Sequence, residues 1–352
     1  MQKLLVDCVA RLHELGLQVK AIVSDQGSNF LKAYQGMGVS VTSPFLTIGD
    51  KTMFVFFDPC HLLKSARNVL EKNNVQNGDC NAKWEHIKSL YDLDAKRSYR
   101  LAPRLGSQHI NLTAFSKMRV RLAAQTLSHS VAAALEMNCA VGTMTSDALV
   151  TAEYAKKFDT MFDCFNSSEA YCTKVYRSSF SAKSKHRNYL LNTMSWLFSL
   201  RVSSLTTGRD ITSQVKCFNG LRNNINALLL LWDDLHSNHG FRFLLTRRLN
   251  QDPLEIFFGV IRQAGGFNAN PTPYQFRNAY RKACFNSLLQ PDRTGNCFPD
   301  GDKLLATQSK LSATAPQTSS SKLTVCPLDM SDLPEPSDLC EKNALMYVCW
   351  FC

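Results

Sequence analysis

The first 77 residues alternate between two patterns of apolar positions. Residues 2–15 carry apolar side chains at the three- and four-residue spacing of an amphipathic helix, and Gly16 follows as its stop. Short apolar runs at 19–24 and 52–57 predict buried strands, each followed by a helical pattern. Helices that alternate with strands through short joins are typical of an α/β layer with parallel strands. We therefore expect an α/β domain over residues 1–77.

The pattern changes to long helical periodicities between residues 78 and 240. The stretch "LTAFSKMRVRLAAQTLSHSVAAALEMN" predicts one long helix with Thr113 as its cap. Three more helical segments follow, and the alternation of apolar and polar residues that marks a strand is absent. We expect an all-α domain over 78–240.

Two basic helical patterns follow, at 241–266 and 270–289. The composition then shifts to Ser, Thr and Pro in "ATQSKLSATAPQTSSSKL" and "DLPEPSD". Such segments bury too little apolar surface to drive folding. We expect residues 291–352 to be mostly disordered, with the apolar end "NALMYVCWFC" either docking back or fraying.

Charge and cysteine usage narrow the class of protein. Lys and Arg number 40 against 29 acids, a net charge of +11, which favours nucleic acid as a partner and an anionic membrane surface second. The sequence shows no apolar run long enough to span a bilayer. The 13 cysteines, without a secretory signal, indicate reduced thiols inside the cell.

Four acids at element boundaries are candidate metal ligands. Asp25 and Asp58 each end a predicted strand, and Asp252 and Glu255 lie three apart on one helix face. Carboxylates are the ligands that Mg²⁺ prefers, and pairs of such ions cut nucleic acid. Each acid also has a structural interpretation. Asp25 suits a turn, Asp58 suits a helix cap before Pro59, and the other two suit a helix start.

Five stretches occur in a fixed order along the chain: "AIVSDQGSNF", "FFDPCHLLKSARNVL", "LTAFSKMRVRLAAQTLSHSVA", "MFDCFNSS" and "LNQDPLEIFFGVIRQAGG". This series resembles the P-element-type DNA transposases and their THAP-domain relatives, over about residues 1 to 290. The patterns "DPxHLxK" and "LNQDPLExFFG" are specific in combination. The resemblance implies an α/β RNase H-like catalytic domain, here incomplete, that is interrupted by a large all-α insertion that binds guanine nucleotide.

On this resemblance the chain divides into four parts. Residues 1–77 would form the N-terminal part of the RNase H-like domain without its first strands, and 78–240 the GTP-binding-like insertion. Residues 241–290 would complete the RNase H-like domain, and 291–352 would be the tail.

The resemblance also implies roles for the acids. Asp25 matches the second catalytic acid of the family, with Asp58 as its rival, and Glu255 matches the third, with Asp252 close by. Asp25 and Glu255 would then bind Mg²⁺ or Mn²⁺. The first acid and the THAP zinc module of the family lie upstream of the segment that begins this chain. We therefore expect a fragment that lacks catalytic activity of its own.

For the insertion, the family's nucleotide-contacting helix corresponds to "RVRLAAQTLSH". The implied contacts are Arg104, Arg119, Val120, Ser128, His129, Phe162 and Asp163. The cations would bind phosphates, the aspartate the guanine N–H groups, and the phenylalanine the face of the base. Arg replaces the typical lysine at 104 and 119, and His129 replaces an asparagine. The alternative, that these residues cap and pack a helical bundle, stays open.

The implied partners are DNA, as transposon ends and target, together with GTP. A homo-oligomer is allowed, no membrane partner is expected, and the role would place the protein in the nucleus. The alternative function is that of a domesticated or decayed relative that binds DNA or nucleotide without catalysis.

Overall fold

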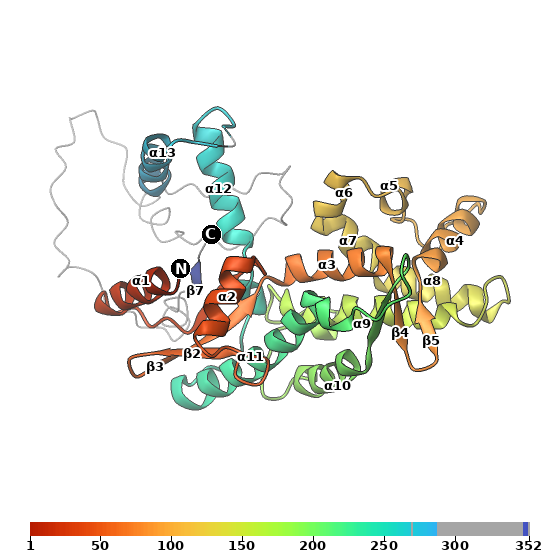
Figure 1. Cartoon of the computed structure of the whole chain (residues 1–352), viewed down its shortest axis with the longest axis horizontal. Coiled ribbons are helices and arrows are strands. Elements are labelled where there is room, and N and C mark those ends of the chain that lie inside the picture. Colours follow the sequence, from red (N-terminus) through yellow and green to blue (C-terminus); the bar gives the residue numbers. More distant parts are fainter. Residues whose placement is uncertain (269, 287–347, 351–352) are drawn as a thin grey trace, which may run out of the picture. The chain divides into compact units, whose positions relative to one another are not determined.

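A computed structural model describes residues 1–268, 270–286 and 348–350 of the chain (Figure 1). They fall into two compact units. One contains Met1–Gln251 together with the short strand β7 (Val348–Trp350), and the other begins at Asp252. Most of the predicted tail, 291–352, lies outside the described residues, so its disorder stays a prediction.

The first unit is built on a sheet with the strand order β2-β3-β1-β7. Strands β1 (Ala21–Ser24) and β3 (Lys51–Phe57) are parallel, which confirms the predicted α/β pairing. Strand β7 pairs in parallel with the other side of β1. Strand β2 (Phe45–Ile48), which the sequence pattern missed, is antiparallel to β3.

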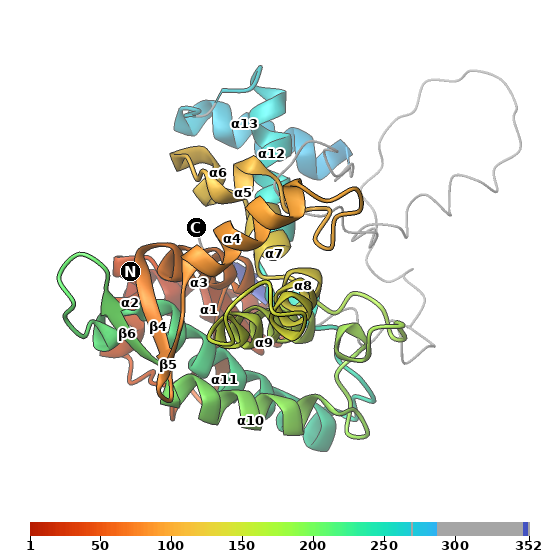
Figure 2. The same ribbon diagram turned by 90° about the vertical axis from the view of Figure 1, so that its right-hand side faces the viewer.

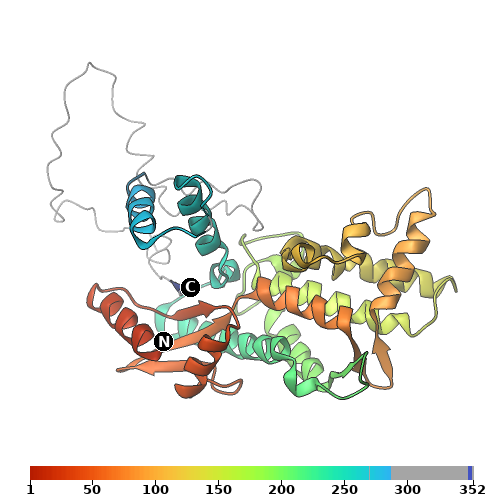
Figure 3. The ribbon, with the colours of Figure 1, turned by 45° about the horizontal axis from the view of Figure 1, so that its top comes forward.

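Helices cover this sheet with apolar faces that the sequence predicts. Helix α1 (Gln2–Glu14) buries Leu5 and Val9, α2 (Ser28–Gly36) buries Phe30, and α3 (Pro59–Lys72) buries Leu62 among others. Gly16 has a positive φ of 81°, which suits glycine at the end of α1. These elements form the red and orange part of Figure 3.

Helix α11 (Lys216–His239) packs on β3, although the sequence assigned it to the insertion (Figure 3). The ladder between β2 and β3 ends at Phe54, so the last residues of β3 lack a strand partner on that side. Asn224 replaces it: its Oδ1 accepts the Phe57 N–H at 2.8 Å and its Nδ2 donates to the Phe57 carbonyl at 2.6 Å. Asn223 donates to the Val55 carbonyl at 2.7 Å. The two amides satisfy buried backbone groups that would otherwise be costly to leave unpaired.

A helical block follows, as predicted, and Figure 2 shows it from the side. Its helices are α4 (Trp84–Ala95), α5 (Ser107–Ile110), α6 (Ala114–Met118), α7 (Val120–Thr126), α8 (His129–Ala140), α9 (Ala148–Phe165) and α10 (His186–Ser199).

The single long helix predicted from Leu112 onward is wrong, because the chain forms α6, α7 and α8 there. Thr113 caps the first of them, as predicted, by accepting the Ser116 N–H. The first break falls at Arg119, whose backbone is extended at φ −80° and ψ 115°. The second falls at Ser128, whose hydroxyl accepts the Val131 N–H and begins α8.

The expectation of an all-α block is also wrong in one respect. Strands β4 (Asn73–Asn77), β5 (Cys80–Ala82) and β6 (Arg201–Ser204) form a small antiparallel sheet of order β5-β4-β6 (Figure 2). These strands are short and polar, so they carry no alternation of apolar residues.

The helix predicted over 241–266 begins later than expected. Leu244 forms a β-bridge with Phe180, and Thr246–Leu249 form a single 3₁₀ turn. The second unit contains α12 (Asp252–Ala264) and α13 (Pro273–Asn286), which pack through aromatic pairs such as Phe258 and Phe276. Within the described ranges, no helix combines the length and apolarity needed to cross a membrane.

Candidate functional site

Two acids follow the neighbouring parallel strands of the first unit. Asp25 comes after β1, and Asp58 comes after β3. The Asp58 backbone N–H donates to the Ser24 carbonyl at 2.8 Å, which holds the two strand ends side by side. Open α/β sheets bind ligands at this carboxyl edge, so it is the first place to look for a site.

Asp58 is a buried acid whose oxygens are both occupied. Its residue is 1% exposed. Oδ2 accepts the His61 backbone N–H at 2.8 Å and lies 2.7 Å from His61 Nδ1. Oδ1 accepts the Gln251 N–H at 3.0 Å. The predicted cap before Pro59 is confirmed, and Asp58 has a second role in holding the segment that leads into α12.

Asp25 is exposed and makes a local turn. Its Oδ1 accepts the Gly27 N–H at 2.9 Å, so the predicted turn is present. A Cβ atom at position 27 would lie 2.8 Å from that oxygen, and the turn therefore favours glycine. The turn uses one carboxylate oxygen of an exposed side chain, and this is compatible with a metal ligand as well.

The loop after β1 is fixed from the other side by Gln26. Its side-chain amide donates to the Lys216 carbonyl at 2.9 Å, at the start of α11. A Cβ atom at Gly220, one turn later in α11, would lie 2.4 Å from Gln26 Nε2 and 2.7 Å from Leu62 Cδ2. Glycine at this position permits the close approach that places the Asp25 loop.

Asp252 and Glu255 lie in the first turn of α12, as predicted from their spacing. Asp252 is buried and Glu255 is exposed. They belong to the second unit and Asp25 to the first, so the convergence of these acids stays a prediction. Among the residues that the structure describes, no three or more His, Cys, Asp or Glu side chains gather as a metal site.

Three predicted nucleotide contacts come together where α8 meets α9. Ser128 caps α8, and His129, its first residue, is exposed. Its backbone donates to Asp159, a residue of α9. Asp163 lies one turn further along α9 and is within 3.2 Å of Lys174 Nζ.

Asp159 and Lys174 are members of this cluster that sequence reasoning missed. Lys174 Nζ lies 3.8 Å from an oxygen of Asp159 as well as close to Asp163. Burial raises the pKa of the Asp159 carboxyl above its usual range, while the charge of Lys174 opposes this shift. The spacing of the two aspartates on α9 is the signal that could have paired them.

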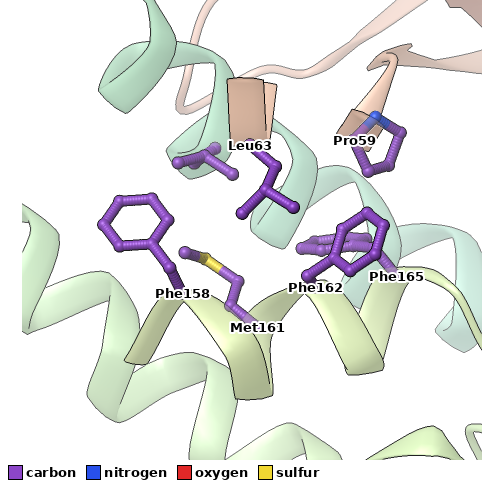
Figure 4. A pocket seen from close by; sticks show the side chains of 7 residues that line it. Pro59, Leu63, Phe158, Met161, Phe162 and Phe165 are labelled. Atoms are coloured by element: carbon purple, nitrogen blue, oxygen red, sulfur yellow. The ribbon is translucent and has the colours of Figure 1, made fainter. Parts of the chain in front are cut away.

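Phe162 packs in an apolar cavity that Figure 4 shows from close by. The side chains that line the cavity with it are Pro59, Leu63, Phe158, Met161, Phe165 and Leu221. Its volume of about 10 Å³ is room for one water molecule and not for a purine base. In this structure Phe162 joins α3, α9 and α11, as the packing alternative expects.

The predicted phosphate contacts Arg104 and Arg119 are exposed, and Val120 is half-buried. Arg119 and Val120 follow the end of α6, where Arg67 of α3 binds the backbone. Arg67 is fully buried and donates to the Lys117 carbonyl at 2.9 Å. Burial lowers the pKa of Arg67 to about 10, and Glu71 opposes the shift. Within the described residues, neither Arg104 nor Arg119 forms an ion pair with Asp159 or Asp163, which pair with Lys174.

Comparison with known families matches two parts of the chain. A family described as the TNP-like, GTP-binding insertion domain matches residues 60–178. A second, the TNP-like, RNase H C-terminal domain, matches residues 248–281, which include Asp252 and Glu255.

Similar proteins point the same way. The Transposable element P transposase of Drosophila melanogaster is 30% identical over 298 residues, which are 81% of this chain and 39% of the relative. The DNA transposase THAP9 of Homo sapiens is 26% identical over 288 residues, 77% of this chain and 31% of the relative. The chain thus spans less than half the length of either protein.

A solved structure is similar as well. The Drosophila P element transposase strand transfer complex matches with a TM-score of 0.72 and 27% identity, over 81% of this chain and 64% of that one. Two family matches, two relatives and one solved structure agree, and the chain is similar to the P-element-type transposases that its sequence motifs resemble.

Proposed function

We propose that the chain acts on DNA as part of a P-element-type transposase. The observation that carries the proposal is the likeness to a transposase solved in a strand transfer complex, at a TM-score of 0.72 over 81% of the chain. The net charge of +11 supports it, since a polyanion binds best to a basic protein.

Asp25 and Glu255 would hold Mg²⁺ or Mn²⁺ in this proposal. Both are exposed carboxylates, which are suitable donors for a hard cation. When bound, the ion supplies Lewis-acid stabilisation of a phosphodiester. Asp58 does not fit this role, because three nitrogen atoms already occupy its two oxygens. It would instead fix the strand end and the segment before α12.

The test begins with DNA binding by the purified chain. A fluorescein-labelled branched duplex, shaped like a strand-transfer product, is titrated at several salt concentrations. We expect saturable binding that weakens steeply with salt, and a lack of binding at low salt would overturn the proposal.

Cleavage and strand transfer are then assayed with Mg²⁺ or Mn²⁺. Asp25→Asn and Glu255→Gln are paired variants that remove a metal ligand but keep the size of the side chain. Activity that each variant abolishes, with DNA binding retained, would support catalysis. Binding without any activity in the unaltered chain would favour the alternative, a non-catalytic relative.

We also propose that GTP binds where α8 meets α9. Asp163 would accept the guanine N–H groups there, which requires the nucleotide to replace Lys174. Calorimetry with GTP and with ATP tests this, using Asp163→Asn and, as a matched control one turn away, Asp159→Asn. Loss of GTP binding in the first variant alone would support the assignment, and equal affinity for both nucleotides in every variant would contradict it.

A role on chromosomal DNA would place the protein in the nucleus, and we include nuclear residence in the proposal. Imaging of the tagged chain tests it, and cytoplasmic retention would count against it. A homo-oligomer on DNA is tested by light scattering of the complex.

A further inference from the structure

The start of α3 pairs a buried carboxylate with a partly exposed imidazole. The Asp58 side chain is 1% exposed, and that of His61 is 37% exposed. Asp58 Oδ2 lies 2.7 Å from His61 Nδ1 and also accepts the backbone N–H of the same residue at 2.8 Å. Two contacts from one residue to one oxygen fix the ring against its own helix. Nε2, on the far side of the ring, is directed away from Asp58.

The helix cap alone does not require a histidine at this position. The cap uses the Asp58 carboxylate and the His61 backbone N–H, which any residue other than proline supplies. The cap therefore does not account for the imidazole side chain of His61. A carboxylate on one ring nitrogen is also the arrangement by which proteins fix a histidine whose other nitrogen acts on a ligand.

The pair lies at the carboxyl edge that contains Asp25. The Asp58 N–H donates to the carbonyl of Ser24, the neighbour of Asp25, and Ser24 is in register with Phe57. If the scissile region of DNA approaches Asp25, its phosphates come to this edge. An imidazolium whose Nδ1–H is held by Asp58 can donate a charge-assisted hydrogen bond from Nε2.

We propose that His61 donates from Nε2 to a phosphate oxygen of bound DNA, with Asp58 as the residue that positions it. This inference rests on the proposed DNA binding and adds a contact to it. It assigns the DPCH segment a function beyond the cap.

Two variants of the full chain separate a phosphate contact from a structural role. The amide of His61→Asn reaches the place of Nδ1 and can keep the contact with Asp58. The amide of His61→Gln reaches the place of Nε2 and can donate outward. Affinity for the fluorescein-labelled branched duplex is measured in EDTA over a range of NaCl concentrations, so that the readout does not depend on metal. Thermal melting is recorded for each variant.

A phosphate contact predicts about a tenfold loss of affinity for His61→Asn, with the log–log salt slope reduced by about 0.9, and near-normal binding for His61→Gln. A purely structural role predicts the reverse order, and that order or unchanged binding by His61→Asn would overturn the proposal. Should His61→Asn melt early, His61→Ala keeps the backbone cap and is expected to lose the same affinity. If the unaltered chain itself does not bind DNA, the proposed function fails first, and this inference fails with it.

Discussion

The loops after β1 and β3 begin with the same residue but use it differently. Asp58 is 1% exposed, and three nitrogen atoms contact its carboxylate. Asp25 is exposed and accepts one backbone N–H from its own turn. The next residues explain the difference: Pro59 starts α3 at once, whereas Gln26 and Gly27 insert a turn before α2. Burial and three nitrogen contacts give Asp58 a structural role, whereas exposure leaves the Asp25 carboxylate accessible to a ligand.

The largest effect that tests this comparison is expected from Asp58→Ala. The change leaves the His61 and Gln251 N–H groups without their acceptor, and the second of these bonds is buried. We expect the free energy of unfolding to fall by roughly 2 to 4 kcal/mol. Urea denaturation followed by tryptophan fluorescence measures it. A loss below about 0.5 kcal/mol, the usual range of surface changes, would show that the bonds from Asp58 to His61 and Gln251 do not stabilise the fold.

Gly220→Ala tests how α11 supports the Asp25 loop. The added methyl group meets Gln26 Nε2 and Leu62 Cδ2 well inside contact distance, while a helical alanine recovers about 1 kcal/mol of propensity. We expect a net loss of about 1 to 2 kcal/mol in urea denaturation. Gly259→Ala in α12, where a Cβ meets no atom within 4 Å, is the matched control and should be neutral or stabilising. Equal effects of the two changes would show that the Gln26 contact is unimportant.

Asp159 extends the comparison to a third acid. It is mostly buried, and the charge of Lys174 only partly offsets the cost of burying its carboxylate. Because burial raises its pKa in the folded state, the native protein holds this proton to a higher pH than the unfolded chain does. Its contribution to stability therefore falls as pH rises from the unfolded pKa of about 3.9 through the folded one. Asp159→Asn should raise stability at pH 7 by roughly a few tenths of a kcal/mol and have no such effect at pH 3. Thermal melting across pH measures this effect. A lower melting temperature of Asp159→Asn at pH 7 would contradict the prediction.

A similarly small effect on stability is expected from Asp25→Ala. Only one exposed turn contact is lost, and we expect a change within about 0.5 kcal/mol in the same urea experiment. A loss as large as that of Asp58→Ala would abolish the distinction between the two acids.

Local signals made part of this structure predictable. The cap at Asp58 follows from an Asp-Pro pair before an apolar helix, and the cap at Thr113 follows from similar local chemistry. The bond from Gln251 to Asp58 joins residues 193 apart, and single-sequence patterns do not report such contacts. The same holds for Asn224, which ends the β3 ladder from 167 residues away.

In the helical block, tertiary contacts break a helix that the sequence pattern predicts as continuous. The run from Leu112 to Asn138 contains neither Gly nor Pro, so nothing in it predicts the extended backbone at Arg119. Arg67 holds the carbonyls at the end of α6 at this break, and that support comes from a distant helix. In the candidate site, the resemblance drew attention to Asp163, while its partner Lys174 emerged only from the fold of the following loop.

The pairing of β4 with β6 has a consequence for evolution. The strand that leads into the helical block and the strand that leaves it are hydrogen-bonded neighbours, from Asn73 with Ser204 to Gln76 with Arg201. The helical block therefore begins and ends at adjacent strands of the small sheet. Segments whose ends lie close together tolerate insertion and deletion well. Loops between these strands can lengthen or shorten among relatives while the register of β1 and β3, and with it the edge that carries Asp25, remains unchanged.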